Sequence, residues 1–144
     1  MDWFNYYGLI IIAVIMIPNI LSAILDKSSF ENNACSKAFL VIEQIGRYCC
    51  MASMVFNIPF TYFGFWFDSA LAVYLAANGA LLLIYISGWI IFCKSRCTAK
   101  MLWLSITPTV LFMFSGVVVS SIPLLVSAVL FGVGHITVSY QNRT

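Results

Sequence analysis

Two charged side chains, Glu43 and Arg47, lie four residues apart inside an otherwise apolar segment, AFLVIEQIGRYCCMASMVFNIPF. Residues i and i+4 of an α-helix share one face, so a carboxylate and a guanidinium at this spacing can form an ion pair. A charged residue at the centre of a membrane helix costs roughly 2.5 to 3.5 kcal/mol on insertion scales, and intramembrane charge commonly marks a functional site. The pair is therefore the first candidate for a site.

Polar side chains on three other predicted helices lie in the same layer as Glu43. Asn19, Ser105 and His135 fall about five residues, or roughly 7 Å, from the same predicted membrane boundary. A charged or imidazole group that faced lipid would be costly, so we expect these helices to turn their polar residues inward. Together with Glu43 and Arg47, these residues predict a polar cavity that opens to the cytoplasm.

Asn57 extends the candidate site along the segment that carries Glu43. Polar, thiol and thioether side chains recur there at alternating intervals of four and three residues, which places them on one helical face. The members of this stripe are Glu43, Arg47, Cys50, Met54, Asn57 and Thr61. Pro18, directly before Asn19, is expected to open the first helix and to free backbone carbonyls for the cavity. The predicted binding residues are Glu43, Arg47, His135, Asn19, Ser105 and Asn57.

Two alternatives use the same residues differently. In a structural or accessory subunit, the ion pair would only fix helix packing, with His135 and Asn19 satisfying it. An intramembrane enzyme would use Glu43 and His135 as acid and base, but there is no second buried carboxylate and no phosphate-binding loop. The five cysteines contain no Cys-x-x-Cys and predict neither a metal site nor a disulfide. No cofactor is expected.

The elements that must carry these residues follow from the composition. The chain has 144 residues, 62% of them hydrophobic and 8% charged, whereas about 25% of residues are charged in soluble domains. The mean hydropathy is +1.00. We predict an all-α integral membrane protein, a compact bundle forming a single domain over residues 1–144. Since roughly 20 apolar helical residues cross a hydrocarbon core, we place helices at about 6–25, 38–60, 70–93, 101–118 and 122–140.

The positions of Lys and Arg predict the orientation of the bundle. With five crossings, the basic residues outside the helices all fall on one side, and the other side receives Asp2 and Asp68. These basic residues are Lys27, Lys37, Lys94, Arg96, Lys100 and Arg143. By the positive-inside rule, the N-terminus is outside and the C-terminus inside. The short loops are typical of a multi-pass protein of a prokaryotic plasma membrane.

These observations predict a small, transporter-like polytopic membrane protein. It would bind or translocate a small polar or amphiphilic solute, with Glu43 and Arg47 as the central contacts. The expected partners are the lipid bilayer and this solute, and no pattern in the chain predicts nucleic-acid binding. Five short helices enclose little volume, so a two-fold homodimer is also expected.

Overall fold

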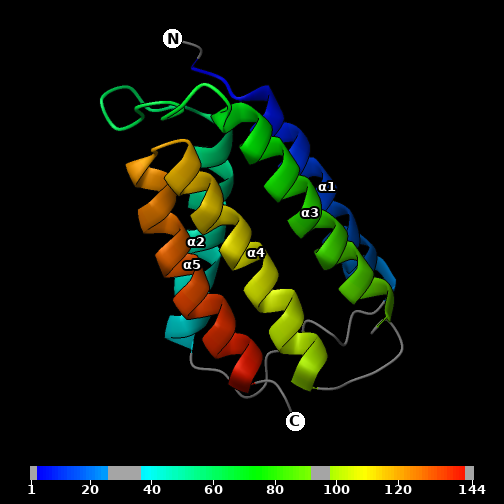
Figure 1. Cartoon of the computed structure of the whole chain (residues 1–144). Helices are drawn as coiled ribbons and strands as arrows, with labels where there is room; N and C mark the ends of the chain where they lie inside the picture. The colour runs from blue at the N-terminus through cyan, green and yellow to red at the C-terminus, as the bar shows by residue number, and fades with distance from the viewer. Residues whose placement is uncertain (1–2, 26–36, 92–97, 142–144) are drawn as a thin grey trace.

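Five helices fold into one bundle in the computed structural model, which describes residues 3–25, 37–91 and 98–141 (Figure 1). In chain order they are α1 (Tyr6–Leu25), α2 (Lys37–Val55), α3 (Ala70–Ile91), α4 (Thr98–Val118) and α5 (Ile122–Gln141). The prediction of an all-helical fold is therefore confirmed for the described residues. Four of the basic residues used to predict the orientation, Lys27, Lys94, Arg96 and Arg143, lie outside them.

Three of the helices, α2, α3 and α5, are long and apolar enough to cross a membrane. The apolar parts of α1 and α4 that the structure describes, Tyr6–Leu21 and Leu102–Val118, are shorter. Large apolar side chains such as Ile10, Leu83 and Ile91 are highly exposed on the surface of the bundle. An exposed apolar surface of this extent is expected where a protein meets lipid or another protein.

Helix α2 ends at Val55, before the predicted end at residue 60. Pro59 lacks an amide hydrogen and disfavours helical geometry at the residue before it, so the helix cannot continue through this segment. The chain pairs instead with the N-terminal stretch. The amide of Asn57 donates to the carbonyl of Trp3 at 2.9 Å, and the amide of Asn5 donates to the carbonyl of Val55 at 2.7 Å. Asn57 is therefore a loop residue, which corrects the prediction that it continues the helical stripe.

Residues 3–5, 56–69 and 119–121 form one end of the bundle, which we call the loop end. The amide of Phe63 donates to the carbonyl of Ser120 at 3.2 Å, and the amide of Ile122 donates to the carbonyl of Thr61 at 3.1 Å. The loop after α2 is thus tied to the turn between α4 and α5. Ser120 has a φ of 51°, in the left-handed region, which lets the chain reverse within a few residues.

The most extensive contact in the bundle joins α2 to α5. A Cβ added at Gly134 would lie 2.7 Å from the backbone nitrogen of Glu43, and one added at Gly46 would lie 2.5 Å from that of Phe131. Glycine allows membrane helices to approach this closely. Helix α5 also packs on α4, and α4 on α3, whereas α1 makes smaller contacts with α3 and α2. In Figure 1, α1 and α2 meet near the loop end and lie apart at the opposite end.

Candidate functional site

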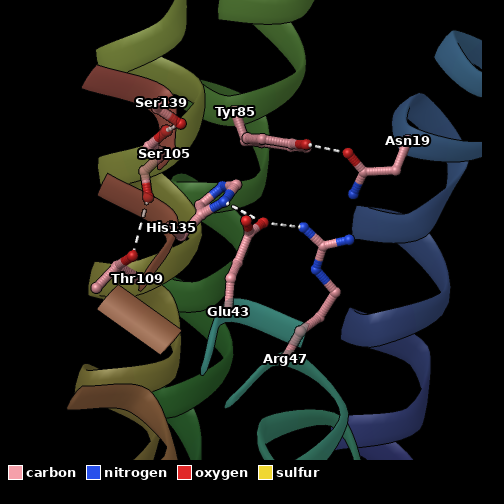
Figure 2. Close-up of polar contacts among 8 residues, drawn as sticks. All are labelled: Asn19, Glu43, Arg47, Tyr85, Ser105, Thr109, His135 and Ser139. Atoms are coloured by element: carbon pink, nitrogen blue, oxygen red, sulfur yellow. Dashed lines mark hydrogen bonds and ion pairs between the residues drawn. The ribbon is translucent and has the colours of Figure 1, made fainter. Parts of the chain in front are cut away.

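The carboxylate of Glu43 joins side chains from two helices. Its Oε1 accepts a hydrogen bond from Nη2 of Arg47 in α2 at 2.5 Å, and it lies 2.8 Å from Nδ1 of His135 in α5 (Figure 2). The Glu43 side chain is only 6% exposed, whereas those of Arg47 and His135 are 29% and 20% exposed. The buried acid therefore lies behind two partly exposed nitrogen groups.

Close helix packing and ring stacking position His135. Gly134, the preceding residue, lies directly against the backbone of Glu43, so the two helices approach at the level of the site. The imidazole also stacks on Phe131, one turn earlier in α5, with ring centroids 4.7 Å apart and an angle of 19° between the planes. Both contacts restrict the orientation of the ring, which directs Nδ1 at the carboxylate.

Opposite charges compensate one another in this cluster. Arg47 is a permanent cation. An ionised Glu43 can only accept hydrogen bonds, so the hydrogen in the contact between Glu43 and His135 is on Nδ1 of His135. A neutral imidazole then accepts at Nε2, and a protonated one donates there. The cluster can thus be neutral or carry one net positive charge. Such a group can bind a hydrogen-bonding or anionic partner, or relay a proton, as ionisable residues inside membrane proteins do.

A small cavity lies beside the cluster, and all five helices line it. Its polar residues are Asn19 of α1, Arg47 of α2, Tyr85 of α3 and His135 of α5. The apolar part of its wall consists of Ile15, Met16, Met51, Pro108, Phe112 and Phe131. The cavity volume is about 40 Å³. This is enough for a few water molecules, since each needs roughly 10–15 Å³ of such space.

Asn19 lies at this cavity, as the depth argument predicts. Its Oδ1 accepts a hydrogen bond from the Tyr85 hydroxyl of α3 at 3.0 Å, and its Nδ2 donates to the carbonyl of Ile15 at 3.2 Å (Figure 2). The prediction that Pro18 opens the first helix is wrong, because α1 runs through Pro18 without a break. A proline removes a single amide donor, and the surrounding helix and its neighbours can compensate for it in a membrane protein.

Ser105 belongs to a neighbouring network of hydroxyl groups that joins α4 to α5. Its hydroxyl donates to the hydroxyl of Ser139, and its backbone carbonyl accepts from the Thr109 hydroxyl at 2.9 Å (Figure 2). Thr107 likewise donates to the carbonyl of Trp103 at 2.8 Å. These side-chain bonds to carbonyls one turn earlier flank Pro108, the cavity residue of α4 that has no amide hydrogen.

Asn57 does not lie with the residues around Glu43 and the cavity. It follows the end of α2 at the loop end and pairs with Trp3 through the backbone. Glu43 lies near the other end of the same helix, roughly 20 Å away at 1.5 Å per residue. The predicted stripe of α2 does face inward as far as Met54, since Glu43, Cys50 and Met54 are all buried.

A second buried polar cluster lies nearer to the loop end and is missing from the predicted site. Asn78 of α3 donates from Nδ2 to the carbonyl of Tyr74 and accepts at Oδ1 from the Ser115 hydroxyl of α4, both at 2.9 Å. All three side chains are fully buried. The Tyr74 hydroxyl makes no hydrogen bond of normal geometry among the described residues, although the side chains of Asn5 and Ser115 lie near it. One signal was available: Tyr74, Asn78 and Tyr85 recur at intervals of four and seven on one face of α3.

Within the described ranges, no group of three His, Cys, Asp or Glu side chains is arranged to hold a metal ion. Cys49 is an exposed free thiol and Cys50 a buried one. Cys35, Cys93 and Cys97 lie outside the described residues. The cavity thus offers a guanidinium, an imidazole, an amide and a phenol to a partner.

No protein-family model, curated protein or solved structure matches this chain. A helical bundle alone does not specify an activity, so the function of this chain depends on the chemistry of its site.

Proposed function

We propose that this chain is a membrane protein that binds or translocates a small polar or amphiphilic solute at the cavity beside Glu43 and Arg47. The observation that supports this proposal best is the convergence of Arg47, His135, Asn19 and Tyr85 on one cavity. These residues come from four different helices.

The size and chemistry of the cavity restrict the solute. Pockets for drug-sized ligands occupy about 300–1,000 Å³, far more than the cavity of about 40 Å³ beside Arg47. The solute is therefore very small, or only the polar end of an amphiphile enters while its apolar part stays in lipid. Arg47 is a hydrogen-bond donor, and His135 adds a second when it is protonated, whereas the Tyr85 hydroxyl already donates to Asn19 and can only accept from a solute. Carboxylate, phosphate or carbonyl oxygens are the groups that suit this lining.

The proposal includes five membrane crossings with the N-terminus outside. Helices α1 and α4 contain 20 and 21 residues, or about 30 Å at 1.5 Å per residue, which matches the hydrocarbon thickness. Exposed aromatic rings such as Trp3, Phe60 and Trp66 mark the loop end, as in an interfacial belt on the outer side. At the opposite end, Lys37 begins α2 and Lys100 lies in the first turn of α4, as expected for the cytoplasmic side of a prokaryotic plasma membrane.

A structural role for the same residues is the second candidate. The observation in its favour is the close contact of Gly134 with the backbone of Glu43, which makes the Glu43–His135 pair part of the α2–α5 interface. In this case the chain would be an accessory membrane subunit, and the buried ion pair would specify how the helices pack.

Native mass spectrometry of the purified protein distinguishes the two candidates. Wild type is compared with the Glu43→Gln, Arg47→Met double variant, in which both charges are removed together, and with Cys49→Ser on the exposed side of α2 as a control. We expect a co-purified small molecule on wild type and on the control that is lost from the folded double variant. Equal occupancy of all three proteins would contradict binding at the cavity, and an unliganded wild type would favour the structural role.

A further inference from the structure

One polar side chain of α2 points away from the bundle. Gln44 is exposed, directly after the buried Glu43, and no hydrogen bond joins its carboxamide to the described part of the chain. It lies about 10 Å along the axis from Lys37, where α2 begins. In a membrane-crossing α2 this depth is hydrocarbon, where an unpaired amide is costly. Helix α2 is also the least apolar of the three candidate membrane spans. A protein partner on this face would account for both the exposed amide of Gln44 and the low hydropathy of α2.

The exposed residues around Gln44 form one narrow stripe along α2, with the spacing that the exposed faces of α4 and α5 also have. Four of them are spaced four, three and four residues apart and lie within an arc of about 60° at 3.6 residues per turn. We call these residues the α2 seam: Val41, Ile45, Tyr48 and Ala52. Alternating intervals of four and three residues are those of the core positions in left-handed helix pairs, which are common in membranes. Gln44 and Cys49 flank the seam on its two sides.

We propose that the α2 seam is the interface of a parallel homodimer. Two copies inserted the same way in one membrane are related by a two-fold axis along the membrane normal, which sets the two α2 helices side by side and parallel. In a parallel pair of helices, a residue that flanks the seam on one side lies beside a residue of the other helix that flanks the seam on its other side. The second residue is five positions further along the sequence. Gln44 of each copy then lies beside Cys49 of the other, twice per dimer.

This arrangement gives the Gln44 carboxamide hydrogen-bonding partners in the second copy. The thiol of Cys49 and the hydroxyl of Tyr48 are both exposed on the same face. Ala52 is small enough to let the two helices approach closely, as small residues do in membrane interfaces. The proposal requires that α2 crosses a membrane. It does not require solute binding, because none of the four seam residues lines the cavity, whose α2 residues Met51 and Arg47 lie about 90° and 130° around the helix from the seam centre.

Disulfide cross-linking in phosphatidylcholine vesicles tests this interface with the full-length chain. Cys49 is kept, the other four cysteines are replaced by alanine, and Gln44→Cys is added. Oxidation with copper phenanthroline should link position 44 of one copy to Cys49 of the other and give a covalent dimer. The matched control carries Leu83→Cys, at an exposed position of α3, with Cys49→Ala. We expect this control to remain monomeric.

The strength of the association gives a second measurement that does not depend on cysteine. Interhelical hydrogen bonds in membranes contribute about 0.6–2 kcal/mol each, and Gln44→Leu removes two of them per dimer. Dimerisation should therefore weaken roughly 7- to 700-fold in single-molecule photobleaching of vesicles. Gln44 is exposed, so this change should not unfold the protein. A wild type that is monomeric at every density, with lipid on the seam, would overturn the proposal. Cross-linking of Leu83→Cys as efficient as that between positions 44 and 49 would also overturn it.

Discussion

Replacing Gly134 with alanine should push α5 away from α2 and break the contact between His135 and Glu43. The added Cβ would lie 2.7 Å from the backbone nitrogen and 2.8 Å from the Cα of Glu43, and these atoms cannot rotate away. An ordinary contact begins at 3.4 Å, so the helices must separate by about 0.7 Å, the difference between 3.4 and 2.7 Å. The same shift lengthens the Nδ1–Oε1 distance from 2.8 Å to about 3.5 Å, beyond the normal hydrogen-bond range.

The expected loss of stability follows from three effects. Overpacking of a close contact costs about 1–3 kcal/mol, and loss of a hydrogen bond to a charged group costs about 1.5–3 kcal/mol. Alanine is a better helix former than glycine by about 1 kcal/mol, which offsets part of this loss. We expect the free energy of unfolding to fall by about 3 kcal/mol. The assay is reversible unfolding by dodecyl sulfate in mixed micelles, followed by circular dichroism.

Gly79 provides the matched control, because a Cβ at this position of α3 would have nothing within 4 Å. Gly79→Ala should be neutral or stabilising by up to about 1 kcal/mol. If Gly134→Ala and Gly79→Ala unfold at the same detergent fraction, the close approach of α2 and α5 does not limit packing. The account of how His135 is positioned would then be refuted.

Three further experiments test other parts of the structure. Removing Arg47 alone leaves the buried Glu43 carboxylate with only His135 as a partner and should cost up to about 3–5 kcal/mol, whereas removing Glu43 alone leaves the Arg47 side chain, which is 29% exposed, and should cost less. Glu43→Gln with Arg47→Met should recover much of the larger loss in the same unfolding assay. A double variant no more stable than the worse single one would show that the charges do not compensate. Tyr74→Phe should leave the free energy of unfolding unchanged or raise it, because the hydroxyl makes no hydrogen bond of normal geometry within the described ranges; a loss above about 1 kcal/mol would contradict this. Single cysteines at Ser69 and Ser95 should react with an impermeant maleimide from outside and from inside, respectively, and labelling of both from one side would exclude the proposed topology.

The part of the site that depends on local geometry could be predicted from the sequence. Glu43 and Arg47 share a helix, so their spacing alone indicates the ion pair that forms. Equal depth and inward rotation predicted that His135 and Glu43 share a space, but their direct contact also needs α5 to pack beside α2 in this register. Asn57 was misplaced because the stripe was extended through a segment in which Pro59 stops the helix.

The rest of the site depends on how distant segments align. Gly46 and Gly134 are recognisable as small residues, but the register that sets Gly134 against Glu43 is a property of two helices far apart in the chain. The pairing of Asn78 with Ser115 has the same origin. Periodicity shows which face of a helix is polar, and it contains no information about which neighbour that face meets.

The hydrogen bonds at the loop end determine where α1 can pivot. The stretch before α1 is bonded to the chain at the end of α2 through Asn5 and Asn57, and Gly8 lies against the carbonyl of Met54. From Gly8 to Leu25 the helix is a lever about 25 Å long. A tilt of about 6° around that pivot displaces the far end by roughly 2.6 Å, close to the diameter of a water molecule. Any such tilt would leave the hydrogen bonds of the loop end in place and would have to break the Tyr85–Asn19 hydrogen bond, which joins α1 to α3.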